Sequence, residues 1–292
     1  MTSIAMEPDP RLGVSQRRAI ASEWIKFRSL RSTWWSIGLA LLASVGLGIL
    51  FADLRGDDIA THGGFEQDPT ALSLRGFYLA QLAVGVLGVL FITGEYSTGM
   101  IRATLSALPR RIPVWAAKIA VFAGVIFVIS LVAAFITFLG GQAVLSSYHV
   151  HGLLSVGPKG GVAFSRGPAG TLHSLGVSLS HPGSLRAVFG AALYMMGVGL
   201  LGLGCGFIVR NAGGAIAALF GLLLVLPLLA QALPSPEQEH VTKFLPLLAG
   251  TAGMSTTSGT NQLGPWAGLG VFALYVIAAL AIGLLVLRRR DA

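Results

Sequence analysis

The sequence predicts an all-α membrane protein with six transmembrane helices, and three observations carry that prediction. Of its 292 residues, 54% are hydrophobic and only 11% are charged, which leaves too little polar surface for a water-soluble domain of this size. Six apolar stretches approach or exceed the ~20 residues that a helix needs to cross a ~30 Å hydrocarbon core. Basic residues gather between alternate stretches. The predicted spans are residues 34–54, 76–93, 114–139, 187–209, 212–233 and 266–287.

The basic residues orient these spans. They cluster before the first span, between the second and third, between the fourth and fifth, and after the last, whereas the other loops are richer in Asp and Glu. The positive-inside rule therefore predicts that both termini are cytoplasmic. The net charge of +8 is mainly a signal of topology. Short basic clusters beside apolar spans suit anionic membrane lipids, so no nucleic-acid partner is expected.

Residues 1–33 are predicted to form a cytoplasmic tail that ends in an interfacial helix, and residues 34–292 the six-span domain. From about Ser15 to Leu30, apolar residues recur along one side of a helix and polar residues along the other. This pattern is typical of a helix that lies in the membrane interface with its cations toward the lipid phosphates. A disordered basic tail is the alternative. The stripe holds Ile20, Trp24, Phe27 and Leu30, and the polar face Arg18, Ser22, Lys26 and Ser29; the main interfacial residues are Trp24, Lys26, Phe27, Arg28 and Arg31.

The loop between spans two and three is longer than a turn requires. Ile101, Leu105 and Leu108 recur at helical spacing, Ser97 or Thr98 can cap the start of a helix, and Pro109 can end it. The pattern predicts a short amphipathic helix that docks a cytoplasmic partner. A helix that lies passively on the bilayer is the alternative.

Several motifs of energy-coupled or catalytic membrane proteins are missing from the sequence, and their absence limits how the chain could work. None of its four lysines stands in a Gly-Lys-Ser/Thr context, so no P-loop is present to bind nucleotide phosphates. No carboxylate falls in the middle of a span, which disfavours a gradient-driven secondary carrier without excluding it. No span offers a serine with a histidine, or paired acids, for an intramembrane hydrolase. The chain is therefore not expected to be an enzyme or to hold a cofactor.

Four segments together resemble a permease subunit of the type-2 ATP-binding-cassette (ABC) transporter family, close to the bacterial exporters of drugs and natural products. They are residues 22–35, residues 95–111 followed by Lys118, residues 213–218 and residues 288–292. The resemblance implies that the loop after span two is a coupling helix and that Glu95 ties it to neighbouring cytoplasmic elements. The implied coupling residues are Glu95, Thr98, Gly99, Ile101, Arg102, Leu105, Arg110 and Arg111.

The same resemblance implies the setting of the chain. It implies a multi-pass protein of the bacterial plasma membrane, a separate ATPase subunit that binds ATP and Mg²⁺, and a second permease chain in a homodimer or heterodimer. It also implies an outer re-entrant hairpin between spans five and six, over residues 243–248 and 255–262. A membrane scaffold or sensor that docks a cytoplasmic partner without transport remains the alternative function.

The outer loop at 146–184 is longer and richer in glycine than the family leads one to expect, and residues 157–161 and 166–170 mark turns or flexible chain. His149 and His151 would share one face of an extended segment and could hold a metal, but solvated histidines are the preferred interpretation. Small residues four apart predict close helix packing. These pairs are Gly202 with Gly206, Gly214 with Ala218, and Gly264 with Gly268.

Overall fold

The computed structural model describes residues 16–29, 31–62, 68–101, 111–151, 153–156, 162–165, 172–256 and 262–289. Within them the chain is almost entirely helical, and six helical segments are long and apolar enough to cross a membrane. This confirms the six predicted spans. They run over Ile37–Ala60, Pro69–Ser97, Ile112–Ser147, Ser184–Val209, Ala212–Ala230 and Pro265–Arg289.

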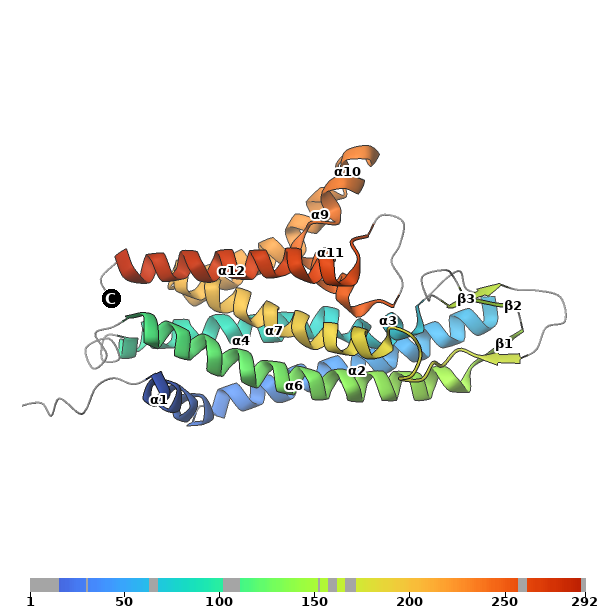
Figure 1. Cartoon of the computed structure of the whole chain (residues 1–292), viewed down its shortest axis with the longest axis horizontal. Coiled ribbons are helices and arrows are strands. Elements are labelled where there is room, and N and C mark those ends of the chain that lie inside the picture. Colours follow the sequence, from blue (N-terminus) through green and yellow to red (C-terminus); the bar gives the residue numbers. More distant parts are fainter. Residues whose placement is uncertain are drawn as a thin grey trace, which may run out of the picture.

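The bundle is elongated, and α1 lies at the same end as the last turns of α12 (Figure 1). Four short strands stand at the opposite end. In chain order the helical elements are α1 (Gln16–Ser29), α2 (Arg31–His62), α3 (Pro69–Ser73), η2 (Leu74–Gly76), α4 (Phe77–Ser97), α6 (Arg111–Ser147), α7 (Ser184–Val209), α8 (Ala212–Phe220), η3 (Gly221–Val225), α9 (Leu226–Ala230), α10 (Ser235–Thr242), α11 (Pro246–Thr251), η4 (Ala252–Met254) and α12 (Pro265–Arg289).

Spans two and four form the centre of the bundle. About 67% and 72% of their most apolar windows are buried, against 28%, 22% and 22% for spans one, five and six. Glycines let α4 and α7 approach closely. A methyl group added at Gly88 would overlap the carbonyl oxygen of Gly199, and one at Gly202 would overlap that of Gly85. Backbones at this separation exclude any larger side chain.

The predicted small-residue pairs differ in outcome. Gly202 and Gly206 pack on α4, as predicted, and Gly268 packs against the carbonyl oxygen of Ala249 in α11. Gly264 has open space around it, so its prediction is wrong within this chain. Gly214 and Ala218 are both exposed on α8, and that pair does not pack into the core either. Cys205 is a buried free thiol in α7.

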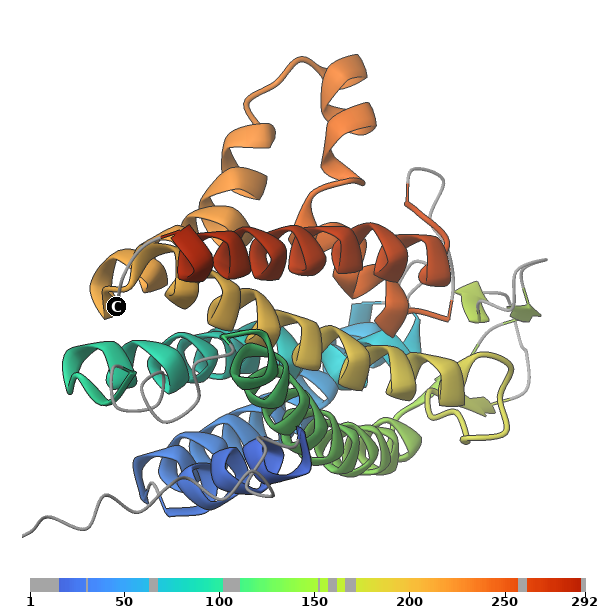
Figure 2. The same ribbon diagram turned by 60° about the vertical axis from the view of Figure 1, so that its left-hand side comes forward.

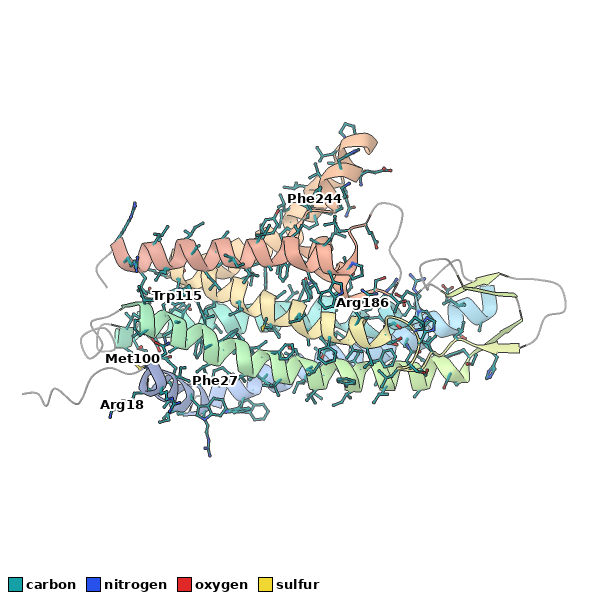
Figure 3. The ribbon with its side chains drawn as sticks, in the orientation of Figure 1. Arg18, Phe27, Met100, Trp115, Arg186 and Phe244 are labelled. Atoms are coloured by element: carbon teal, nitrogen blue, oxygen red, sulfur yellow. The ribbon has the colours of Figure 1, made fainter. Side chains whose placement is uncertain are left out.

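Span five bends and leaves the bundle. The π-helical turn η3 follows α8, and Pro227 stands at the start of α9. After this bend α9 and α10 project from the bundle as an arm, and α11 returns toward α12 (Figures 1 and 2). Phe244 lies on this projecting part (Figure 3). α10 and α11 form a helical hairpin whose turn and second helix fall in the first part of the predicted segment. Residues 257–261 of that segment lie outside the described residues, and its re-entry into the membrane stays a prediction.

The outer loop contains strands that the sequence did not predict. β1 (His149–His151) pairs with β4 (Leu172–Ser174), and β2 (Leu153–Val156) pairs with β3 (Val162–Ser165), both antiparallel. Runs of three or four residues are too short for a period of two to be visible in the sequence. Both predicted turn segments fall between strands and outside the described residues. Of the described residues, no three His, Cys, Asp or Glu side chains gather closely enough to hold a metal ion.

Candidate functional site

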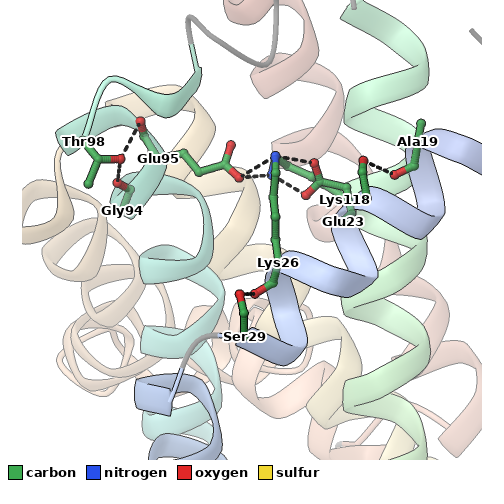
Figure 4. A network of polar contacts seen from close by, with 9 residues as sticks. Ala19, Glu23, Lys26, Ser29, Gly94, Glu95, Thr98 and Lys118 are labelled. Carbon is green, nitrogen blue, oxygen red and sulfur yellow. Dashed lines mark hydrogen bonds and ion pairs between the residues drawn. The ribbon is translucent and has the colours of Figure 1, made fainter. Parts of the chain in front are cut away.

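Four charged side chains meet at the end of the bundle that carries α1. Glu23 and Lys26 come from α1, Glu95 from the last turn of α4 and Lys118 from the first turns of α6 (Figure 4). Lys118 Nζ donates to Glu23 Oε2 at 2.6 Å and to Glu95 Oε1 at 2.5 Å. Lys26 Nζ donates to Glu23 Oε1 at 3.0 Å and lies 3.4 Å from Glu95 Oε1. We call these four residues the charge cluster.

An aromatic layer positions α1 over the cluster. Ala19, Glu23 and Phe27 are four residues apart, share one face of α1 and are buried. The Phe27 ring lies 5.5 Å from that of Phe91 and 6.5 Å from that of Phe122, in tilted and edge-on geometry. Such aromatic contacts add to the free energy gained by burial, so α1 is held against α4 and α6 rather than resting loosely on them.

The charge cluster is largely buried, and its formal charges sum to zero. The Lys118 side chain is 0% exposed, those of Glu23 and Glu95 are 2% and 8% exposed, and that of Lys26 is 26% exposed. Two carboxylates and two ammonium groups balance, which is the condition for keeping charges out of water. Lys118 Nζ also lies 5.2 Å from the centre of the Phe91 ring, where the ring face attracts a cation.

The pKa of Lys26 reports the balance of two effects. Burial alone would lower this pKa, but the hydrogen bond to Glu23 and the negative charges of Glu95 and Glu23 outweigh it and raise the pKa above 10.5. Lys26 therefore stays protonated at neutral pH.

Glu95 lies in the last turn of α4, just before the loop between spans two and three. Two hydrogen bonds to the Gly94 carbonyl, from the Ser97 and Thr98 hydroxyls, help end the helix. Gly99 then adopts a left-handed φ of +70°, which favours glycine. Ile101 turns back into the core and is 3% exposed. The start of the loop is thus fixed at both Glu95 and Ile101.

Two details of this loop correct or limit the sequence prediction. Ser97 and Thr98 were expected to cap the next helix, but their hydroxyls bond backward to α4 because the Gly94 carbonyl is within reach. Beyond Ile101 the predicted coupling helix, with Arg102, Leu105 and Arg110, lies outside the described residues. Arg111 begins α6, and its side chain is not described.

The two faces of α1 also differ from the prediction. Lys26 was assigned to a polar face toward lipid phosphates, but it points into the charge cluster. Phe27 is 0% exposed, whereas Trp24 on the predicted same stripe is 45% exposed. The reason is that Glu23 finds Lys118, 95 residues away, and this pairing rotates α1 so that Glu23 faces inward. Arg28 remains on the exposed side, and neither Leu30 nor the side chain of Arg31 is described.

A second contact joins the same end of the bundle to α12. Arg210, in the turn between α7 and α8, has a left-handed φ of 61°, its guanidinium lies 5.2 Å from the centre of the Tyr96 ring, and it donates to the Val286 carbonyl at 3.2 Å. α4 is therefore linked to α1 and α6 through Glu95, and to α12 through the next residue.

The sequence carried a signal for two other members of the charge cluster. Lys118 is the only lysine in the third span, and an ammonium group in an apolar helix needs an acid partner. Glu23 is the only acidic residue between Asp9 and Asp53. Treating each isolated charge as one half of an ion pair would have connected Lys118 to Glu23 and to Glu95.

The architecture defines a multi-pass membrane protein with a buried charge cluster at the end that carries α1. Residues 19–158 match the family model described as ABC-2 family transporter protein, and this region holds all four cluster residues. The match supports an ABC-2 type permease, a class of membrane transport components that associate with ABC ATPase subunits and are not themselves catalytic. No curated protein matches the chain at a significant level.

Proposed function

We propose that the chain is one half of the membrane part of an ABC exporter, which works with a second permease and two separate ATPase subunits. The substrate would be amphipathic, drug-like or lipid-like, and the ATPase subunits would bind ATP and Mg²⁺. The observation that supports this most is the charge cluster, because it ties the start of the loop between spans two and three to two other helices.

The cluster suits a loop that transmits movement. Glu95 is ion-paired to α1 and α6, and Ile101 packs in the core a short distance further along. Since packed cores shift between discrete arrangements rather than stretch, a push on this loop would move α1, α4 and α6 together. Glu95 Oε2 is buried and has no hydrogen-bond partner within the described residues, so it can accept one more hydrogen bond when a subunit docks.

The exposed spans suit a second permease chain. Spans one, five and six keep most of their apolar surface outside this chain, where only lipid or another chain can cover it. We assign span five as the main lining of a path between two permeases, with exposed Leu224, Val225 and Leu228 on its bent part. Span two, which is mostly buried, would add its exposed Tyr78, Leu79 and Leu90.

The test separates docking from transport. Glu95→Gln and Ile101→Asp should reduce the ATPase activity that the permease stimulates in its partner, and reduce substrate transport, in proteoliposomes. Glu239→Gln is the matched control, because Glu239 is exposed on α10 outside the cluster. Unchanged coupling in both cluster variants, with normal membrane insertion, would contradict the proposal.

The same preparation tests the alternatives. The purified chain alone should neither hydrolyse ATP nor accumulate substrate under a proton or sodium gradient. Gradient-driven transport without an ATPase would restore the secondary-carrier reading. An ATPase that binds the chain and changes activity, with no substrate movement, would favour the scaffold or sensor.

A further inference from the structure

A cavity of about 510 Å³ lies at the other end of span two, away from the charge cluster. Its walls come from the first turns of span two, from the turn between α10 and α11, and from η4 with the residue after it. Its lining includes Arg75, Lys243, Leu248 and Met254. Its volume falls within the range of small-molecule sites, roughly 300–1,000 Å³.

The wall of this cavity is held in place by a polar frame. Asp68 caps α3 by accepting from the backbone N–H groups of Thr70 and Ala71, and its second oxygen accepts from Ser255 Oγ at 3.1 Å and from the Thr256 N–H. Arg186 donates to the Ser255 carbonyl at 3.0 Å. The end of the hairpin is therefore fixed to the starts of spans two and four, so the cavity is preformed.

The cavity is positively charged. Arg75 and Lys243 both line it, each half-buried, and none of the described residues that line it is acidic. No ion pair joins either cation to a described carboxylate. Asp68 is turned to the frame instead. Leu248 and Met254 add apolar wall beside the two cations.

The level of the cavity in the membrane indicates which kind of molecule could occupy it. Arg75 and Glu95 are twenty positions apart on span two, which is about 30 Å at 1.5 Å per residue, the thickness of the hydrocarbon core. If Glu95 marks one membrane surface, Arg75 lies at the level of the head groups on the other. Phosphate and carboxylate groups of amphiphiles are found at that level, and guanidinium and ammonium groups bind them.

We propose that this cavity binds the anionic head group of an amphiphile, with Arg75 and Lys243 on the phosphate or carboxylate and with Leu248 and Met254 against the first carbons of its chain. The occupant is a membrane lipid or a transported amphiphile with the same chemistry. This site does not depend on the proposed coupling role of the charge cluster, which lies at the opposite end of span two.

The test is a titration of the purified full-length chain, in neutral detergent, with dihexanoylphosphatidylglycerol, dihexanoylphosphatidylcholine or inorganic phosphate. Calorimetry should show that the anionic lipid binds at least about ten-fold more tightly than the zwitterionic lipid. Arg75→Gln and Lys243→Gln should each weaken the binding of the anionic lipid by about ten-fold. Arg17→Gln is the control, because it removes the same charge from an exposed site on α1.

Equal affinity for the two lipids, or the same loss in the control, would overturn the proposal. Inorganic phosphate that binds as tightly as the anionic lipid, with the same sensitivity to Arg75→Gln, would support an anion site and assign it to a free anion. Lys243→Gln keeps the test decisive if Arg75→Gln fails to fold, because Lys243 lies in the turn between two short helices.

Discussion

Replacing Lys118 by Met should destabilise the chain by about 3–5 kcal/mol, the usual cost of removing one partner from a buried ion pair. The Lys118 side chain is wholly buried and contacts two carboxylates at 2.6 and 2.5 Å. Without it, Glu23 and Glu95 would share only Lys26, whose side chain is 26% exposed and whose two contacts are longer. One of the two carboxylates would then be buried without a full countercharge.

The loss of stability should depend on how deeply the removed charge is buried, and not only on its removal. Lys26→Met should cost only about 1 kcal/mol, because that ammonium is nearer to solvent and its ion pairs are correspondingly weak. Arg17→Met should change stability by no more than about 0.5 kcal/mol, as is usual at an exposed site without a special role. A variant that combines Lys118→Met with Glu23→Gln and Glu95→Gln should regain most of the loss, since no carboxylate would then be buried without a countercharge and the ammonium of Lys26, whose side chain is 26% exposed, can turn toward solvent.

The assay is reversible unfolding in mixed micelles with rising fractions of a denaturing detergent, followed by circular dichroism. The free energy of unfolding of each variant is compared with that of the unmodified chain, and coupling between Lys118 and Glu95 is taken from a double-mutant cycle. A loss below about 1 kcal/mol for Lys118→Met would refute the reasoning, as would a triple variant no more stable than Lys118→Met alone.

Three further outcomes are expected. Gly88→Ala should lose at least about 2 kcal/mol in the same assay because the added methyl group meets backbone, whereas Gly46→Ala, which has open space around it, should be neutral or slightly stabilising. The stability that Lys26 adds should be complete below pH 10.5 and lost as the pH rises through its raised folded-state pKa, so the difference between the unmodified chain and Lys26→Met should vanish in strong alkali. An impermeant thiol reagent should label Ser165→Cys and not Ser106→Cys in intact cells, and the reverse pattern would contradict the predicted orientation.

The six spans could be predicted because apolar length is a local property. A stretch of about twenty apolar residues crosses the membrane as a helix whatever its neighbours are, since only a helix satisfies its backbone groups there. The span boundaries accordingly differ from the structure mainly at the ends, where helices continue beyond the apolar run. Span three is the clearest example, since the sequence indicated 114–139 and the helix crosses over Ile112–Ser147.

The charge cluster was only partly predictable, because it joins residues far apart in the chain. Resemblance singled out Glu95, but the sequence does not state that its partners are Lys26 and Lys118, 69 and 23 residues away. The orientation of α1 has the same cause. Helical periodicity located a helix from about Ser15 to Leu30, close to the observed Gln16–Ser29, but not the face it buries, because one buried ion pair outweighs a weak apolar stripe.

The bend in span five shows what hydropathy cannot report. Gly221 and Pro227 stand in an apolar run that reads as one straight helix, because hydropathy is the same for a straight and a bent segment. In the structure the run breaks at the π-helical turn, and α9 and α10 leave the bundle. Lys243, in the turn between α10 and α11, then lines the same cavity as Arg75 of span two. The cavity and its charge therefore depend on a local backbone irregularity, which is why the sequence alone pointed to the hairpin and not to the site beneath it.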